Sequence, residues 1–524
     1  MTCPSDKIFR VFGPPGTGKT TRLLNEVDRC LERDVPPHRI GFFAFTRKAA
    51  IEARTRARER FNLTDEELPN FRTLHSFCYR HSGIAQSALM GSEHWKELQN
   101  ILGFTLRGAT ANPEEVEDVF SLFSPQDEVL NLAHIAAIRK TTLREAYDSW
   151  SEAHRYPWPR VEYIAQVYED YRKTAGVFDF TDMLRQFVRL GRGVCPTFDT
   201  IFVDEAQDLS ALQWDVVNII AEKSDRVIVA GDDDQAIYKW AGADVEYFLG
   251  LGGATETLDQ SWRVPSKVHQ IAQRIADQIT HRYPKKYMPQ DRAGEVHHIY
   301  DPTTLLEPMR QGTWLVLAQC WYMLDELSDE LQRGGFVFEK KNNKSLREAL
   351  LMAINAWMKL GRDQEINGRE ARRMYEYMSS GDAVRRGFKK LNGLDDDDLV
   401  SYETLVDDFG LLVPKDEPWF TALDRLPEAD RAYLRAAEDR GESFNAKPRI
   451  TLSTIHGAKG GEADNVVLFQ DVSRRSLAEA EALSSWDDLH RTFYVGVTRT
   501  REKLFLVEPR SPFESYTVDS FAGV

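Results

Sequence analysis

The chain has 524 residues, and its 82 acidic residues outnumber its 67 Lys and Arg residues, which gives a formal net charge of −15. This length exceeds what a single hydrophobic core fills, so at roughly 100–200 residues per domain we expect two to four domains. The acidic balance argues against a generally basic, histone-like protein, but it leaves room for a local basic groove, because charges act over about one Debye length.

Cysteine usage and hydropathy exclude several further classes. The five cysteines are scattered and form no CxxC pair, so a zinc ribbon or a cysteine-ligated cluster is not expected. Their odd number, together with a start that has no apolar leader, favours a reducing, cytoplasmic compartment. No apolar run approaches the roughly 20 residues that span a bilayer, so we expect no membrane partner.

The first part of the chain alternates strand-like and helical segments. Ile8–Phe12 has the pattern of a short strand, and the glycine-rich segment Gly13–Thr20 follows it directly. A helical pattern then runs to Leu31. Ile40–Thr46 is almost continuously apolar, as expected for a buried parallel strand, and a helix rich in Ala, Arg and Glu follows at about Lys48–Arg60.

Two long helical stretches interrupt this alternation. Residues 84–174 are polar and helical without a convincing strand, and Lys344–Lys447 is helical and strongly charged. Strand patterns recur between and after them, at Thr200–Val203, Arg226–Ala230, Trp314–Gln319, Ile450–Thr454, Asn465–Phe469 and Lys503–Val507. This order predicts two α/β domains with parallel sheets, each interrupted by a helical insertion.

The segment Gly13-x4-Gly18-Lys19-Thr20 matches the P-loop pattern in full, between a predicted strand and a predicted helix. Glycines let backbone N–H groups turn inward around phosphate oxygens, at a helix N-terminus that already favours anions. Lys19 is expected to reach the β- and γ-phosphates, and Thr20 to ligate Mg²⁺. The nucleotide contacts predicted for this loop are Gly13, Pro14, Pro15, Gly16, Thr17, Gly18, Lys19, Thr20 and Thr21. A chance glycine-rich turn is the alternative, and the strand–helix context argues against it.

Acidic residues end the strand pattern at Thr200–Val203. Asp204 is placed to hold Mg²⁺, directly or through water, and Glu205 to orient and deprotonate an attacking water. An acidic helix N-cap would use the same residue type. The P-loop upstream favours the catalytic interpretation, which predicts ATP and Mg²⁺ as cofactors.

A third segment, Val229–Gly242, begins where the strand pattern Arg226–Ala230 ends. Gln235 is positioned as a sensor of the γ-phosphate, and Tyr238 and Trp240 follow closely. If these aromatics are exposed beside such a sensor, the presence or absence of the γ-phosphate would change how bases stack on them. Two core aromatics explain this segment equally well, so both interpretations remain open at this point.

With further segments in the same order, these motifs make the sequence similar to the UvrD/Rep/PcrA-like superfamily 1A DNA helicases. The segments that match the remaining motifs of that family are Phe45–Ala50, Thr73–Phe77, Leu258–Pro265, Thr451–Gly460 with Glu462, and Tyr494–Arg499. The resemblance extends from the P-loop to about Leu506, with both helical insertions variable. It implies an α/β fold of two RecA-like P-loop NTPase domains, each with a mainly helical insertion, in the 1A, 1B, 2A, 2B arrangement.

The resemblance also suggests where the domains begin and end. The expected ranges are 1–84 and 175–258 for motor domain 1A, 85–174 for insertion 1B, 259–343 and 448–524 for motor domain 2A, and 344–447 for insertion 2B. The 2B insertion is small for this family, so control by protein partners through it is expected to differ.

At the nucleotide site, the resemblance assigns roles to individual residues. Arg263 and Arg499 would be arginine fingers, whose fixed guanidinium groups stabilise the charge that develops on the transferring phosphoryl group. Glu462 would help to hold the nucleotide sugar or the fingers. Trp262 replaces the usual Tyr of the family and would stack on adenine. The expected catalytic set is Lys19, Asp204, Glu205, Gln235, Arg263 and Arg499.

On the DNA side, the resemblance implies platforms for bases and phosphates. Base stacking on aromatic side chains is worth about 1–3 kcal/mol per base and tolerates any sequence. The expected DNA contacts are Phe45, Thr46, Lys48, His75, Tyr238, Trp240 and His456, with Arg47 as a further backbone contact. DNA rather than RNA follows from the family alone.

The implied function is an ATP-driven motor that moves 3′→5′ along single-stranded DNA and separates duplex DNA at single-strand/duplex junctions. One alternative is a DNA-stimulated ATPase that displaces proteins or loads partners without processive unwinding, and the small 2B insertion keeps it open. Another is a P-loop signalling switch, against which the two finger arginines argue. A protein partner that binds through the 2B insertion is compatible with either motor.

Besides the small 2B insertion, two further departures from the family pattern affect these expectations. Only 12 residues precede Gly13 and none is Gln, whereas family members carry a glutamine segment there that reads adenine. The preference for ATP over other nucleotides therefore stays open. Gly461 replaces the usual Leu after Thr451–Gly460, which predicts more backbone freedom there.

Overall fold

The computed structural model of the chain describes residues 5–45, 47–106, 127–150, 152–340, 343–444, 446–482 and 485–518. Apart from the gaps between these ranges, the residues fall into two compact units: 5–295, 472–501 and 516–518 form the first, and 296–471 and 502–515 the second. Each unit is built on one large sheet. None of the helices in the described part of the chain is long and apolar enough to cross a membrane.

The sheet of the first unit has six strands in the order β3-β2-β4-β5-β1-β6, and its neighbouring strands are all parallel. These strands are β1 (Ile8–Phe12), β2 (Ile40–Ala44), β3 (Phe71–Thr73), β4 (Phe198–Val203), β5 (Ser224–Gly231) and β6 (Ala254–Thr257). Every residue of β2 is buried, as its apolar run predicted. Because parallel neighbours end at the same edge of a sheet, the segments that follow β1, β4 and β5 come together there.

Helices connect these strands, as parallel neighbours require. The helices of the first unit are α1 (Lys19–Leu31), α2 (Arg47–Phe61), α3 (Leu74–Ser82), α4 (Ser92–Leu102), α5 (Glu128–Arg139), α6 (Leu143–Asp148), α7 (Trp158–Ala175), α8 (Phe180–Leu190), α9 (Ala211–Glu222), α10 (Val245–Gly250), α11 (Ser266–Ala276), α18 (Arg474–Ala482) and α19 (Asp487–Val497). The short strands β7 (Gln260–Pro265) and β8 (Met288–Gln290) pair in parallel outside the main sheet. The helix predicted at about Lys48–Arg60 is confirmed as α2.

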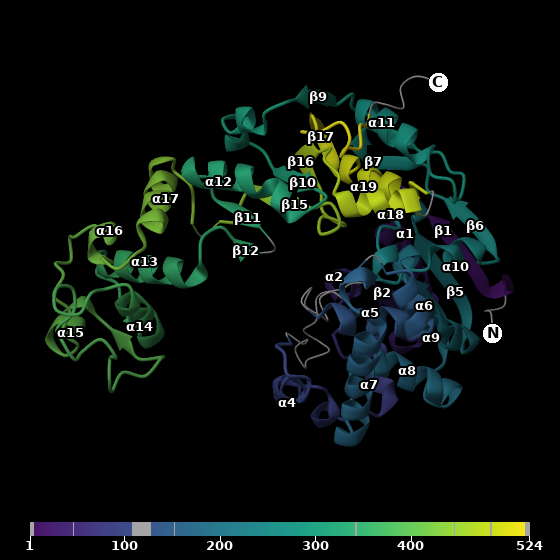
Figure 1. Cartoon of the computed structure of the whole chain (residues 1–524), viewed down its shortest axis with the longest axis horizontal. Coiled ribbons are helices and arrows are strands. Elements are labelled where there is room, and N and C mark those ends of the chain that lie inside the picture. The colour runs from purple at the N-terminus through teal and green to yellow at the C-terminus, as the bar shows by residue number, and fades with distance from the viewer. Residues whose placement is uncertain are drawn as a thin grey trace. The chain divides into compact units, whose positions relative to one another are not determined.

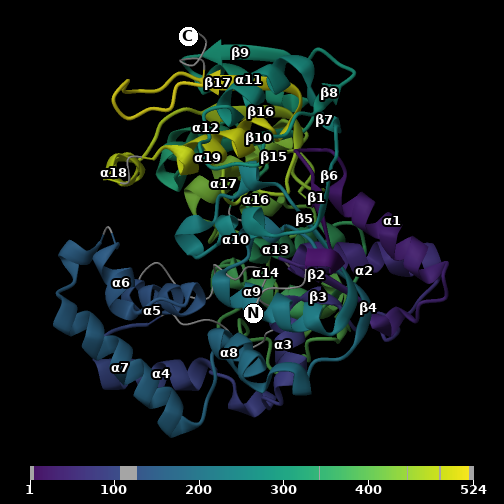
Figure 2. The ribbon, with the colours of Figure 1, turned by 90° about the vertical axis from the view of Figure 1, so that its right-hand side faces the viewer.

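Helices α4 to α7 share a hydrophobic core of their own, which includes Trp95, Leu98, Val161 and Tyr168. The rings of Trp95 and Tyr168 stack with their centroids 6.0 Å apart. Figure 2 shows these four helices lying together. Within the described part of 84–174 the regular structure is helical, without a strand, as the sequence predicted.

The sheet of the second unit has seven strands in the order β12-β11-β15-β10-β16-β17-β9. They are β9 (Glu295–Ile299), β10 (Trp314–Ala318), β11 (Phe338–Lys340), β12 (Asn343–Lys344), β15 (Ile450–Thr454), β16 (Ala463–Phe469) and β17 (Thr500–Val507). β10 lies between β15 and β16 and is parallel to both. Helix α12 (Asp325–Arg333) packs against this sheet through Leu327 and Leu331, which belong to the same core as Val316 and Leu452.

Residues 344–447 contribute a separate hydrophobic core to the second unit. Its helices are α13 (Glu348–Leu360), α14 (Gly368–Glu376), α15 (Tyr402–Asp407), α16 (Trp419–Ala422) and α17 (Glu428–Asp439), joined by the two-stranded ribbon of β13 (Ile366–Asn367) and β14 (Leu399–Val400). Figure 1 shows α13, α14, α15 and α16 gathered together. The core is built around Trp357, Tyr375, Leu405 and Leu434.

One lysine joins the two ends of this stretch. Lys344 Nζ donates to the carbonyl oxygens of Phe444 at 3.4 Å and Ala446 at 3.1 Å. The chain therefore leaves the sheet after β12 and returns to it before β15 at neighbouring points.

Candidate nucleotide site and nucleic-acid face

The P-loop lies between β1 and α1, at the carboxyl edge of the first sheet. Gly16 and Gly18 have φ angles of 73° and 81°, in the left-handed region that glycine adopts without strain. Lys19 folds back over the loop, and its Nζ donates to Gly13 O at 2.9 Å. A Cβ on Gly13 would lie 1.9 Å from Lys19 Cγ, so only glycine leaves room for this lysine. Backbone conformation and space thus explain the glycines at positions 13, 16 and 18 of the motif.

Two carboxylates follow β4 at the same edge. Asp204 Oδ2 accepts a hydrogen bond from Thr20 Oγ1 at 2.8 Å, and Glu205 Oε1 lies 3.7 Å from Lys19 Nζ. Burial raises the pKa of Asp204 to about 6, and the neighbouring Glu205 carboxylate acts in the same direction. Glu205 has a φ of 53°, a left-handed conformation that is costly for a residue other than glycine and typical of functional sites.

The oxygen donors at this edge suit Mg²⁺. Mg²⁺ in phosphate-binding proteins takes one or two carboxylates and completes its shell with phosphate oxygens and water. Thr20 and Asp204 supply a hydroxyl and a carboxylate in direct contact. Among the described residues there is no cluster of three or more His, Cys, Asp or Glu side chains that would hold a metal without a phosphate ligand.

Gln235, which the sequence predicted as a sensor, is joined directly to one of the two predicted finger arginines. Gln235 follows β5 in a short 3₁₀ turn, Asp233–Gln235. Its Oε1 accepts a hydrogen bond from Arg499 Nη2 at 2.6 Å, and its Nε2 donates to Asp232 Oδ2 at 2.6 Å. Arg499, 2% exposed, follows α19. The structure therefore brings together two residues that the sequence placed 264 positions apart.

The second arginine lies against the P-loop. β7 carries Ser261, Trp262 and Arg263, and a Cβ on Gly16 would lie 2.4 Å from Arg263 Cβ. Trp262 N donates to Gly16 O at 2.9 Å, and Ser261 Oγ donates to Pro15 O at 2.7 Å. The Trp262 side chain is 76% exposed and so presents its ring to solvent. Sequence reasoning missed Ser261, although its position inside the motif Leu258–Pro265 was the available signal.

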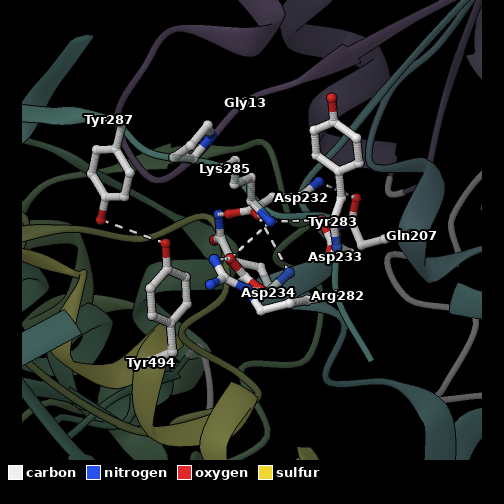
Figure 3. Close-up of polar contacts among 12 residues, drawn as sticks. Gly13, Gln207, Asp232, Asp233, Asp234, Arg282, Tyr283, Lys285, Tyr287 and Tyr494 are labelled. Carbon is white, nitrogen blue, oxygen red and sulfur yellow. Dashed lines mark hydrogen bonds and ion pairs between the residues drawn. The ribbon is translucent and has the colours of Figure 1, made fainter. Parts of the chain in front are cut away.

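Sequence reasoning also missed an ionic cluster next to Gln235. Lys285 Nζ lies within 3.1 Å of carboxylate oxygens of Asp232, Asp233 and Asp234, and all four side chains are buried (Figure 3). Arg282 donates to both Asp234 oxygens, at 2.8 and 2.6 Å. Three consecutive acids at the end of a strand were a visible signal, but nothing local in the sequence identifies the cations that pair with them.

Three of the predicted DNA-contacting aromatics form a row. Phe45 and Tyr238 are buried, and their rings stack with centroids 5.7 Å apart. Trp240 lies edge-on to Tyr238 at 6.4 Å and is 51% exposed. Each of the two interpretations left open for this segment therefore fits one residue. Tyr238 is a core aromatic, and the Trp240 ring is exposed to solvent.

The C-terminus of α5 supports the loop that carries Trp240. Arg139 Nη2 donates to Lys239 O at 2.6 Å. A Cβ on Gly242 would lie 2.6 Å from Ile138 Cδ1, so the loop and the helix are in close contact. The helical stretch predicted as an insertion thus helps to fix the exposed tryptophan.

The remaining predicted DNA contacts are placed as follows. His75 is 6% exposed on α3, and burial lowers its pKa to about 3, so its imidazole is neutral at neutral pH. Thr46 lies outside the described residues. Lys48 lies on α2, and only its backbone is described. His456 and Glu462 are half-buried in the second unit, between β15 and β16.

Comparison with known proteins gives consistent matches. The sequence model of the UvrD/REP helicase N-terminal domain matches residues 1–254, and that of the UvrD-like helicase C-terminal domain matches residues 428–510. The ATP-dependent DNA helicase PcrA of Staphylococcus aureus is 27% identical over 314 residues, which cover 56% of this chain and 41% of that protein. PcrA of Staphylococcus epidermidis is 27% identical over 316 residues, with the same coverage of both chains. The match thus spans less than half the length of these curated relatives.

Among solved structures, the helicase of PRRSV covers 98% of this chain and 54% of its own, at 12% identity and a TM-score of 0.32. A complex of an arterivirus nonstructural protein 10 helicase with DNA gives 10% identity and a TM-score of 0.34.

Proposed function

The chain belongs to the UvrD/Rep/PcrA-like helicase family, and from this premise we propose that it is an ATP-dependent DNA helicase. In this proposal it moves 3′→5′ along single-stranded DNA and unwinds duplex DNA at single-strand/duplex junctions. The observation that carries the proposal is the set Lys19, Asp204 and Glu205 at one sheet edge, in the same unit as the bonded pair Gln235 and Arg499.

Hydrolysis would proceed from these residues. Backbone N–H groups of the P-loop and Lys19 bind the phosphates. Mg²⁺ would be held by Thr20 and Asp204 and would neutralise charge on the phosphate oxygens. Glu205 accepts the proton of the attacking water, while Arg263 and Arg499 stabilise the negative charge that develops on the transferring phosphoryl group.

Nucleotide selection in this proposal depends on stacking. The exposed Trp262 ring covers the adenine, and Glu462 helps to hold the sugar or the fingers. Stacking accepts any base, so adenine preference would be weak without further contacts.

Coupling to DNA would pass through the loop after the sensor. Gln235 and the exposed Trp240 are five residues apart in sequence, so a change at the γ-phosphate can move the stacking surface. Phe45, Thr46, Lys48, His75, Tyr238 and His456 are proposed as the remaining DNA contacts. For His75 the contact would require the buried ring to become accessible.

The proposal includes the domain arrangement of the family. Two RecA-like motor domains would comprise 1–84 with 175–258 and 259–343 with 448–524. Residues 85–174 and 344–447 would be their 1B and 2B insertions. The separate core of 344–447 supports the last assignment and makes this stretch the proposed site for a protein partner. A cytoplasmic location is part of the same proposal.

The small size of that stretch favours one second candidate, a translocase that displaces proteins without processive unwinding. Two assays with the same protein separate the candidates. The helicase displaces a strand from a 3′-tailed duplex and not from a 5′-tailed duplex, and only when ATP is present. The translocase removes streptavidin from biotinylated single-stranded DNA but leaves the duplex intact. ATP hydrolysis that single-stranded DNA does not stimulate would contradict both.

A further inference from the structure

A buried lysine of the first unit, Lys285, lies outside every sequence motif but pairs with three acids inside the segment Val229–Gly242. Lys285, 1% exposed at its side chain, comes from the loop between α11 and β8 and contacts Asp232 at 3.1 Å, Asp233 at 2.6 Å and Asp234 at 2.7 Å (Figure 3). A charge removed from water costs several kcal/mol unless it is paired and hydrogen-bonded. The carboxylates raise the pKa of Lys285 and so keep it charged, although burial acts in the opposite direction.

A chain of polar contacts leads from this lysine to the sensor. Asp232 binds Lys285 through Oδ1 and accepts from Gln235 Nε2 through Oδ2, at 2.6 Å. Gln235 Oε1 then accepts from Arg499 Nη2 at 2.6 Å. An ionised carboxylate only accepts and a guanidinium only donates, so the amide between them has a single satisfied orientation.

The segment that carries Lys285 is also bonded to the helix that precedes Arg499. Asp487, at the start of α19, accepts from the backbone N–H groups of Thr280 and His281 at 2.9 and 3.1 Å. Arg491 on the same helix donates to His281 O at 2.6 Å and to Asp233 O at 3.0 Å. The segment 280–285 therefore fixes the position of α19 relative to the loop that carries Asp233 and Gln235.

We propose that Lys285 is a positioning residue for ATP hydrolysis. Its ammonium holds Asp232 through Oδ1, Asp232 Oδ2 fixes the orientation of the Gln235 amide, and Gln235 fixes Arg499. This inference rests on the proposed function, in which Gln235 and Arg499 act on the γ-phosphate. Neither the P-loop nor Trp262 takes part in the chain of contacts, so hydrolysis depends on Lys285 and nucleotide binding does not.

Two variants test this role. Asp232→Asn leaves Lys285 paired with Asp233 and Asp234 but replaces an obligate acceptor with an amide that offers either end to Gln235. Lys285→Met combined with Asp233→Asn removes one charge of each sign, so the cluster keeps its net charge while the contact to Asp232 is lost. Lys286→Met, at the exposed neighbouring position, is the matched control.

The readouts are kcat for ATP in the presence of single-stranded DNA and the affinity for fluorescent mant-ADP. We expect kcat to fall about 100-fold in both cluster variants, since a misplacement of about 1 Å costs that much. The affinity for mant-ADP should stay within about twofold of wild type, because the P-loop is unchanged. The control should match wild type in both measurements.

Any other outcome contradicts the inference, and each such outcome points to a different reason. Wild-type kcat in folded cluster variants would show that the lysine only stabilises the fold. An equal loss of kcat and of mant-ADP affinity would show general damage to the site. If the double variant unfolds, as thermal denaturation would reveal, Asp232→Asn decides alone. A wild-type protein without ATPase activity would overturn the proposed function, and this inference with it.

Discussion

Thr20 Oγ1 donates a hydrogen bond of 2.8 Å to Asp204 Oδ2, which joins the first turn of α1 to the end of β4 across 184 residues of sequence. The hydroxyl and the carboxylate are oxygen donors of the kind that Mg²⁺ prefers. Lys19 approaches the same point from the P-loop. The cation, the phosphates and the attacking water are therefore expected to bind next to Thr20 and Asp204.

Replacing Asp204 with Asn should raise the Mg²⁺ concentration required for ATP hydrolysis by at least about 10-fold, since a neutral ligand binds the cation less tightly. The measurement is DNA-stimulated ATPase activity as a function of Mg²⁺ concentration. Asp199→Asn is the control, because Asp199 lies at the start of the same strand and pairs with Arg39 at the opposite edge. An unchanged Mg²⁺ dependence in Asp204→Asn would remove Asp204 from the site.

Arg263→Ala should lower kcat by about 10³–10⁵-fold while leaving nucleotide affinity nearly intact, because an arginine finger acts on charge that exists only in the transition state. Trp262→Ala should do the reverse, weakening nucleotide binding and largely preserving kcat. The two residues are adjacent on β7, so each variant controls for local disturbance caused by the other. The prediction fails if both variants change kcat and affinity in the same proportion.

Trp240→Ala should weaken binding to single-stranded DNA by about 1–3 kcal/mol, the value of one stacked base. The ATPase activity measured without DNA should not change. Fluorescence anisotropy with an oligonucleotide measures the binding, and Tyr163→Ala, an exposed aromatic on α7, serves as the control. Equal affinities for Trp240→Ala and wild type would leave the exposed ring without a role in stacking.

The acidic composition bears on the same binding measurement. With few phosphate contacts, the logarithm of the binding constant should fall with the logarithm of salt concentration less steeply than a slope of about −10. A slope that steep would reveal a groove far more basic than the sequence indicates.

Buried His75 should make the fold sensitive to acid. Burial lowers its folded-state pKa to about 3, whereas an unfolded histidine titrates near 6.5, so between these values the unfolded state binds the extra proton. Stability is therefore lost as pH falls below about 6.5, by up to about 1.4 kcal/mol per pH unit from this residue. His134, whose pKa burial lowers to about 4, contributes with the same sign, and Asp182, whose pKa burial raises to about 6, opposes it.

The contribution of His75 is isolated by comparison with His75→Gln. Urea unfolding of both proteins at pH 7 and pH 5 gives the two losses of stability. We expect the smaller loss in the variant, because glutamine takes up no proton in the unfolded state. Equal losses would show that His75 is not held neutral in the folded protein.

The part of the site that the sequence predicted follows from one geometric rule. Lys19, Asp204 and Gln235 each lie in the segment that follows a strand of the first sheet, and parallel strands end at one edge. The position of Lys285 could not be predicted in this way, because its partners Asp232, Asp233 and Asp234 lie about fifty residues upstream and no periodicity links the two segments.

The burial of individual side chains was harder to predict than the order of helices and strands along the chain. His75 belongs to a motif that suggested DNA contact, but it lies on the face of α3 that packs into the interior, where the side chain is 6% exposed. The strands β13 and β14 have two residues each, too few for an alternating pattern to be visible. Tertiary packing decides both features, and it leaves no local signal in the sequence.

Lys344 holds Phe444 and Ala446 beside the point where the chain leaves the sheet. The hundred residues between Lys344 and Phe444 therefore begin and end at neighbouring points of the sheet, as the few residues of a tight turn do. Closing a loop costs only about 0.6 kcal/mol more for each doubling of its length, so the sheet tolerates many lengths and folds at this position. The length of this stretch can therefore change at low cost while the strands on either side keep their register. An engineered short linker between the two ends should be accepted for the same reason.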